Sequence, residues 1–251
     1  MKRVINLFPR PFLIRISVLL RPFLRWFYKG NRFTDPIDGS SYRKFLPYGY
    51  QNIRHNALCP GTLSLERHRL LWLYLERQTN FFNQHLNVLH MAPEQVFYKR
   101  FKQLKNWNYT TADLNSPLAD VKADICNLPF SDESFDLVLC NHVLEHIPND
   151  IRAMQELHRV LKKGGILIAQ VPLDEKRPST FEDDSITDKN ERTRIFGQYD
   201  HVRIYGIDFY ERIQMVGFET QAVDLQKTLS QEEIQRFVLP INEKIPVGKR
   251  K

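Results

Sequence analysis

Short apolar runs that alternate with amphipathic segments over residues 86–225 constrain the fold more than any other feature. The apolar runs predict strands at residues 86–92, 109–114, 120–125, 134–143, 165–172 and 219–225. Helical spacing of apolar residues predicts helices at 93–106, 150–163 and 208–218. Strands that alternate with helices form a mostly parallel sheet with helices on both faces, so we expect an α/β, Rossmann-like fold. Ligands of such sheets bind at the carboxyl ends of the strands.

Local signals mark the ends of these helices. Pro93 suits a first helical turn, and Asn149 and Asp208 are of the residue types that cap helix N-termini. The pair Gly164-Gly165 is predicted to end the second helix, because glycine readily adopts the left-handed conformation of a C-cap.

The net charge of +7 is concentrated at the N-terminus. Residues 1–30 contain seven lysines and arginines and no acidic residue, so the other 221 residues hold 29 basic and 29 acidic side chains. We therefore expect no nucleic-acid partner. The three cysteines, Cys59, Cys126 and Cys140, form no CxxC pair. Their spacing predicts a cytoplasmic, reducing location without a disulfide framework, and we expect no metal ligands.

The N-terminal arm, residues 1–30, combines arginines with apolar side chains such as Phe12, Leu19, Phe23 and Trp26. Arginine interrupts it too often for a membrane-spanning helix. The composition is typical of a helix that lies in a membrane interface beside anionic headgroups, so residues 1–29 are candidates for membrane-surface contact. Docking on the protein's own domain, a cleaved targeting peptide and self-association are the alternatives.

Residues 31–62 contain two Pro/Gly turns, Asp35-Pro36-Ile37-Asp38-Gly39 and Cys59-Pro60-Gly61-Thr62. Their spacing resembles two zinc-ribbon knuckles in which cysteines have been replaced, and one thiolate with two carboxylates makes a poor structural zinc site. We expect either a knuckle-like segment that has lost its metal or two simple turns. Ser64 is predicted to cap a helix over 65–78.

Residues 123–172, ADICNLPFSDESFDLVLCNHVLEHIPNDIRAMQELHRVLKKGGILIAQVP, resemble class I S-adenosylmethionine-dependent methyltransferases of the small-substrate, type 11-like group. The ordered series from LPF through HVLEHI to RVLKKGG carries the resemblance, which extends over about residues 86–225. It implies a methyltransferase domain at 63–228, followed by a C-terminal tail at 229–251, and S-adenosyl-L-methionine as the cofactor.

The resemblance also assigns roles to residues at the strand ends. A carboxylate at the end of the second strand, Asp113, can accept hydrogen bonds from the ribose diol, or it simply caps a loop. Asp124 matches the acidic residue set against the adenine amino group, with Ile125 against the ring. Asn141 and His142 follow the fourth strand, where the family lines the cofactor and substrate mouth.

The loop after the first strand departs from the family pattern. The family has an acidic residue and glycines there, whereas this chain reads His90-Met91-Ala92-Pro93-Glu94. Ala92 is small enough to replace a glycine, and Glu94 is a candidate acceptor for the cofactor's ammonium group. The alternative is that Glu94 is favoured only by the positive end of the helix dipole.

A long irregular stretch, residues 173–207, is predicted to be a lid or binding segment. Its His201 is a candidate general base, held by Asp200, with Arg203 or Tyr205 contacting the substrate. The alternative is a hydrogen-bonded cluster that only anchors the loop.

These features predict a methyltransferase that acts on a small-molecule or lipid- or glycan-linked acceptor. Two alternatives remain. One is a catalytically silent relative that binds a partner or the membrane, which the erosion of both the glycine loop and the metal knuckle suggests. A nicotinamide enzyme is disfavoured by the absence of its Gly-rich fingerprint.

Overall fold

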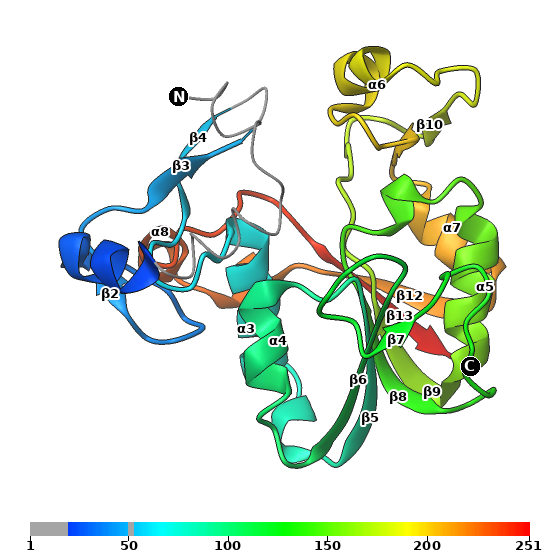
Figure 1. Cartoon of the computed structure of the whole chain (residues 1–251), viewed down its shortest axis with the longest axis horizontal. Helices are drawn as coiled ribbons and strands as arrows, with labels where there is room; N and C mark the ends of the chain where they lie inside the picture. The colour runs from blue at the N-terminus through cyan, green and yellow to red at the C-terminus, as the bar shows by residue number, and fades with distance from the viewer. Residues whose placement is uncertain (1–19, 50–52) are drawn as a thin grey trace. The chain divides into compact units, whose positions relative to one another are not determined.

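The computed structural model describes residues 20–49 and 53–251 (Figure 1). Most of the predicted N-terminal arm, residues 1–19, lies outside the described residues. The chain divides into two compact units, the first comprising Met1–Gln78 and Gln226–Glu243, and the second Thr79–Leu225 and Lys244–Lys251. Nothing within the described ranges forms a helix with the length and apolar character needed to cross a bilayer.

The second unit is built on a seven-stranded sheet in the order β12-β13-β9-β8-β5-β6-β7. The strands β5 to β9 are parallel, and β13 pairs antiparallel with both β9 and β12. This is the expected α/β, Rossmann-like, mostly parallel sheet. Its strands are β5 (Leu86–Met91), β6 (Trp107–Asp113), β7 (Val121–Lys122), β8 (Phe135–Cys140), β9 (Leu161–Ile168), β12 (Phe218–Val223) and β13 (Ile245–Arg250).

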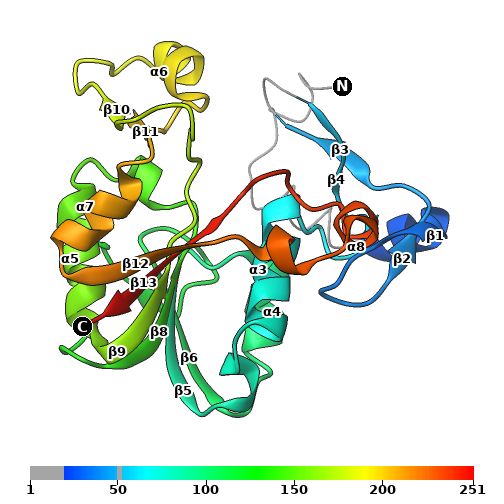
Figure 2. The ribbon, with the colours of Figure 1, turned by 180° about the vertical axis from the view of Figure 1, so that it is seen from behind.

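Helices cover both faces of this sheet (Figures 1 and 2). The helix α4 lies on one face, and α5 and α7 lie on the other. Asn149 caps α5 as predicted, because its side chain accepts a hydrogen bond from the Arg152 amide. The helical elements of this unit are η1 (Phe81–Asn83), α4 (Gln95–Phe101), η2 (Leu144–His146), α5 (Asp150–Val160), α6 (Lys189–Phe196) and α7 (Phe209–Met215), and η3 (Leu225–Thr228) crosses the boundary.

The predicted boundary between α5 and β9 was wrong. The helix ends at Val160, and Gly164-Gly165 lies inside β9 rather than at a C-cap. The register explains the glycines, since Leu161 pairs with Phe135 but Ile166 pairs with Leu137, so four residues bulge opposite one. Gly164 has a φ of +76°, and a Cβ on Gly165 would lie 2.8 Å from the Lys162 carbonyl oxygen.

Two further sequence predictions are corrected in detail. Residues 245–250, expected in the C-terminal tail, form the antiparallel strand β13 between β12 and β9. Asp208 precedes α7 but does not cap it, because its carboxylate accepts a hydrogen bond from the Thr180 hydroxyl at 2.8 Å. A short hairpin of β10 (Phe181–Glu182) and β11 (Arg203–Ile204) organises the stretch predicted to be irregular.

The described residues of the first unit include a helical segment at residues 20–27 and the elements β1 (Lys29–Thr34), β2 (Ser41–Tyr42), β3 (Leu46–Tyr48), β4 (Arg54–Leu58), α3 (Glu66–Arg77) and α8 (Gln231–Arg236). The fully buried Arg69 joins them, because it donates to the main-chain oxygens of Ala57, Ser64, Phe237 and Val238. Ser230 and Glu233 form a capping box at the N-terminus of α8.

The two Pro/Gly turns of the first unit are joined by hydrogen bonds. The buried Asp35 carboxylate accepts from the hydroxyls of Thr62 and Ser64, and also from the Ile37 amide. Ser64 therefore serves this network, and the N-cap position of α3 is Leu65 instead. Burial raises the pKa of Cys59 to about 12, so the one cysteine of residues 31–62 is a protonated thiol.

Candidate functional site

Three loops of the second unit start side by side at the carboxyl edge of its sheet. Met91 in β5 pairs with Ala112 in β6 and with Cys140 in β8. The residues that follow, Ala92, Asp113 and Asn141, therefore leave neighbouring parallel strands at the same level. This edge is where sheets of this class bind ligands, so it is the candidate site.

Ala92 adopts the backbone conformation usually reserved for glycine. Its φ is +46°, and its amide donates to the Ala112 carbonyl at 2.9 Å. The small side chain thus keeps the turn that a glycine would make there, as the sequence predicted for a glycine replacement.

His90 and Glu94 face each other across this loop. His90 is fully buried, with Nε2 2.7 Å from Oε2 of Glu94 and Nδ1 2.8 Å from the Tyr109 hydroxyl. A neutral imidazole with its hydrogen on Nε2 satisfies both contacts, because it donates to the carboxylate and accepts from the hydroxyl. Burial and the charge of Glu94 raise the pKa of Tyr109, which keeps its hydroxyl a donor. The pair fixes the Glu94 carboxylate at the start of α4.

Asp113 ends β6 with a partly engaged carboxylate. Oδ1 accepts from the amides of Asn115 and Ser116. Both hydrogen bonds that the described residues make to this carboxylate end on Oδ1, which leaves Oδ2 for a ligand. A shallow hollow lies along the loop that follows, lined by Asp113, Leu114, Asn115, Ser116, Ala119 and Lys122.

Asp124 and Ile125 lie in the turn after β7. Oδ1 of Asp124 accepts from the Cys126 amide at 2.9 Å, so this carboxylate holds its own turn. Ile125 is buried and belongs to the apolar core of the unit.

Asn141 and His142 present buried polar atoms that no described residue satisfies. Oδ1 of Asn141 accepts from the Gln170 amide, while its Nδ2 has no partner. His142 has a φ of +54°, Nδ1 3.2 Å from Oε1 of Glu145, and an unpartnered Nε2. Buried polar atoms without partners are costly, so these two side chains are suited to hold a polar ligand.

A second group of polar side chains surrounds His201. Its Nδ1 lies 3.2 Å from the Phe196 carbonyl oxygen, and its ring packs edge-on against His146 with centroids 4.7 Å apart. The predicted contact of Asp200 with His201 is not formed, because the Asp200 carboxylate lies 3.5 Å from Nδ1 of His146 and accepts from Gln198. Burial lowers the pKa of His201, although the charge of Glu145 opposes the shift.

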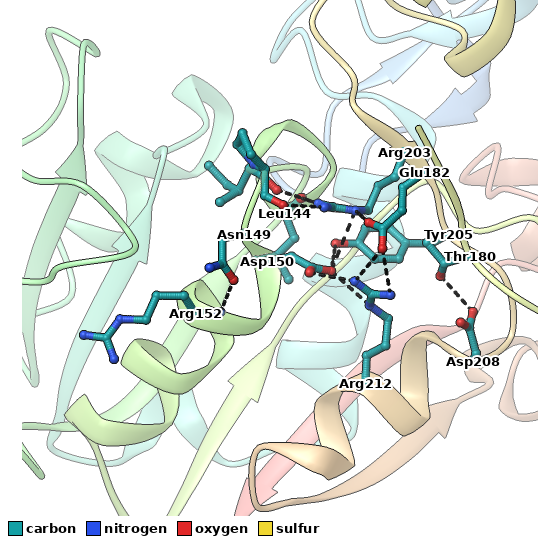
Figure 3. A network of polar contacts seen from close by, with 12 residues as sticks. Leu144, Asn149, Asp150, Arg152, Thr180, Glu182, Arg203, Tyr205, Asp208 and Arg212 are labelled. Carbon is teal, nitrogen blue, oxygen red and sulfur yellow. Dashed lines mark hydrogen bonds and ion pairs between the residues drawn. The ribbon is translucent and has the colours of Figure 1, made fainter. Parts of the chain in front are cut away.

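Arg203 and Tyr205 are structural, contrary to the prediction that one of them contacts substrate (Figure 3). The buried Arg203 donates to the carbonyls of Leu144, Ile147 and Pro148. The Tyr205 hydroxyl donates to the Asp150 carboxylate at 2.8 Å.

The same network includes Glu182 and Arg212, which sequence reasoning missed. Arg212 Nη2 lies 2.7 Å from Asp150, and Arg203 Nε lies 2.8 Å from Glu182 (Figure 3). No spacing in the sequence indicates these pairs, because their members are 21 to 62 residues apart. The network holds the turn of His142–His146 against the stretch that carries His201.

Comparison with known proteins agrees with this fold. Residues 77–169 match a family described as a methyltransferase domain. The chain is 29% identical to the 2-phytyl-1,4-naphtoquinone methyltransferase of Nostoc punctiforme over 132 residues, 53% of this chain and 44% of that one. It is 46% identical to the demethylmenaquinone methyltransferase of Staphylococcus epidermidis over 48 residues, 19% and 20% of the two chains.

The crystal structure of the [4+2]-cyclase SpnF superposes with a TM-score of 0.52 and 15% identity, covering 94% of both chains. That likeness concerns the fold alone. The matched segments span less than half the length of the two methyltransferases compared above.

Proposed function

Since residues 77–169 match a family described as a methyltransferase domain, we propose that the chain is an S-adenosylmethionine-dependent methyltransferase that transfers a methyl group to a small-molecule acceptor with an apolar body. S-adenosyl-L-methionine is the cofactor of this family and supplies an electrophilic methyl group on a sulfonium centre. The observation that carries the proposal is the set of polar groups at one sheet edge, namely Asp113, Asn141 and His142.

These residues fit the cofactor's functional groups. Oδ1 of Asp113 is engaged by two main-chain amides, and the other oxygen, Oδ2, is proposed to accept from the ribose diol. The buried Asn141 Nδ2 and His142 Nε2 need polar partners, which a nucleoside and an amino-acid tail offer. The His90-oriented carboxylate of Glu94 is a suitable acceptor for the ammonium group. Asp124 and Ile125 remain proposed contacts of the adenine.

The residues around His201 support a role at the acceptor. Methyl transfer needs the nucleophile held in line with the methyl group and water excluded. His201 is neutral at neutral pH, and its Nδ1 hydrogen is directed to the Phe196 oxygen. Its Nε2 can therefore accept a proton from an acceptor hydroxyl. Asp200 is proposed to act on His146 rather than directly on His201.

The class of acceptor is supported by the relatives and by the first unit. The two relatives compared above are named for a naphthoquinone and for demethylmenaquinone, which have apolar bodies. In the first unit, residues 20–27 are helical and expose Leu20, Phe23, Trp26 and Phe27, with Trp26 73% exposed. Arg43 stacks over Phe27 at 4.9 Å. Exposed aromatic residues beside arginines suit an anionic membrane surface, so a lipid-linked acceptor is included in the proposal.

Two measurements test the function. Isothermal titration calorimetry with S-adenosyl-L-methionine is expected to detect binding that Asp113→Ala weakens, whereas Asp184→Ala, on an exposed loop of the same unit, leaves it unchanged. A screen of quinol, phenol and lipid-linked acceptors with labelled cofactor is then expected to detect transfer that His201→Ala reduces. A protein that binds neither cofactor nor acceptor would be the silent relative instead.

A further inference from the structure

Three side chains of the second unit converge beside the proposed acceptor position. Glu145 and His146 come from the turn η2, and His201 comes from the loop before β11. One potential ligand atom from each lies within 4.8 Å of the others. The set combines two imidazoles with one carboxylate.

One main-chain hydrogen bond and one hydrogen bond from a side chain to the main chain hold this set together. The Val202 amide donates to the Glu145 carbonyl at 3.0 Å, and Nδ1 of His146 lies 3.2 Å from the Asp200 carbonyl oxygen. The residues on either side of His201 are therefore held against the turn that carries the other two side chains. The loop that carries His201 is therefore tied to the turn both through the main chain and through the His146 ring.

Hydrogen bonding also selects the imidazole tautomers. A carbonyl oxygen can only accept, so Nδ1 of His146 carries its hydrogen toward Asp200, and Nδ1 of His201 carries its hydrogen toward Phe196. Each ring then keeps its lone pair on Nε2. Metal-binding histidines commonly donate their other ring N–H to a carbonyl or carboxylate in this way.

Glu145 supplies an independent indication of a missing partner. Its side chain is almost completely buried, with the residue 1% exposed. Oε1 lies 3.2 Å from Nδ1 of His142, but Oε2 is buried without a partner among the residues that the structure describes. A buried carboxylate oxygen is stabilised by a cation or a donor, and no residue within 20–49 or 53–251 provides either to Oε2.

We propose that Glu145, His146 and His201 bind a divalent transition-metal ion of the zinc class. Two imidazoles and one carboxylate are a donor set that zinc accepts, whereas magnesium and calcium prefer oxygen ligands throughout. Zinc ligands stand at about 2.0–2.2 Å from the metal, so small side-chain rotations would close the set around the ion. Three protein ligands leave a further coordination position open.

The consequence for turnover rests on the proposed function, whereas the binding site itself does not. A bound cation takes up the Nε2 lone pair of His201, which is the lone pair that the proposed proton transfer requires. Metal occupancy and methyl transfer therefore oppose each other.

The binding site is tested on the full chain after treatment with a chelator. Competition against a chromophoric chelator is expected to detect one bound Zn²⁺ per chain. Co²⁺ is expected to give visible d–d bands of a nitrogen- and oxygen-ligated site without sulfur charge transfer. Glu145→Gln and His201→Gln are each expected to weaken Zn²⁺ binding by at least ~10-fold. The control His85→Ala removes an exposed histidine of the same unit and is expected to leave binding unchanged.

Thermal melts without metal establish that each variant is folded. If Glu145→Gln does not fold, His201→Gln, whose substitution lies on a loop, tests the site by itself. Wild-type Zn²⁺ affinity in folded His201→Gln, or the absence of specific Zn²⁺ binding in the wild-type chain, would overturn the site. Added Zn²⁺ is expected to slow methyl transfer by the wild-type chain. If no acceptor is ever methylated, the proposed function fails while the Zn²⁺ measurement still decides the metal site.

Discussion

Oε2 of Glu94 lies 2.7 Å from Nε2 of His90, so the two polar residues that replace the usual loop pattern are paired with each other. The histidine is held in turn by the Tyr109 hydroxyl. Although the loop lacks the glycines of the family, the pairing holds the Glu94 carboxylate in one position, where we expect the ammonium group of the cofactor to bind. The relationship leads directly to the first prediction.

Glu94→Gln is expected to weaken S-adenosyl-L-methionine binding by about tenfold or more, because a hydrogen bond to a charged group contributes ~1.5–3 kcal/mol. Calorimetric titration measures the change. Glu211→Gln, at an exposed position on α7, is the matched control. If Glu94 is favoured only by the helix dipole, the variant would lose a few tenths of a kcal/mol of stability and keep its cofactor affinity.

Ala92 provides a second test of the same loop. At a φ of +46°, a β-branched side chain is strained, so Ala92→Val is expected to lower both stability and cofactor affinity. Ala92→Gly relieves the left-handed conformation and is expected to stabilise the protein by up to ~1 kcal/mol without loss of binding. Denaturant unfolding and calorimetry measure the two effects. A tolerated valine would contradict the tight turn.

The network around Asp150 predicts a large loss of stability. Asp150→Asn removes the negative charge that faces the buried Arg203 and the half-buried Arg212, and removal of one partner of a buried ion pair costs about 3–5 kcal/mol. Glu175→Gln breaks only the half-exposed pair with Lys244, which is worth about 1 kcal/mol or less. Urea unfolding distinguishes them, and equal losses would mean that the network contributes no more than a surface pair.

Much of the sheet was predictable because the apolar runs of β5 and β8 have the length of buried strands and are too short for helices. Asp113 ends its strand as the sequence predicted, and the roles of Asp113 and Asn141 toward the cofactor stay predictions. The role of Gly164-Gly165 was not predictable from the sequence, because glycine is favoured both at a helix C-cap and in a β-bulge. The pairing of Phe135 with Leu161 shows that the bulge is formed.

The substrate role expected for Arg203 was wrong for a related reason. The cluster of polar and aromatic residues around Arg203 lies near the predicted opening of the cofactor and substrate site and has the composition of a binding site. Its function depends on partners that only the tertiary fold supplies, here the carbonyls of Leu144, Ile147 and Pro148. The convergence of Glu145 with His201 is hidden from the sequence in the same way, because 56 residues separate them.

Glu156 in α5 predicts a specific dependence of stability on pH. Its Oε2 accepts from the Leu128 amide at 2.9 Å and from Arg159 at 2.8 Å. The hydrogen bond with Arg159 holds the pKa of Glu156 below its ordinary value of 4.5, with burial opposing the shift. The folded state therefore binds this proton less tightly than the unfolded state. The contribution of Glu156 to stability is complete above pH 4.5 and is lost as the pH falls through the lower folded-state pKa.

Glu156→Gln is accordingly expected to destabilise the protein at pH 7 by about 1.5–3 kcal/mol, because it removes charge-assisted hydrogen bonds from a buried carboxylate. Below pH 4.5 the difference between the wild-type protein and the variant is expected to shrink, since protonation removes the same charge from the wild type. Urea unfolding at a series of pH values measures both effects. Glu191→Gln, whose contact with Arg194 is exposed and 3.8 Å long, should leave the pH profile of stability unchanged. A difference that stays constant down to pH 2 would mean that Glu156 acts through packing and not through its charge.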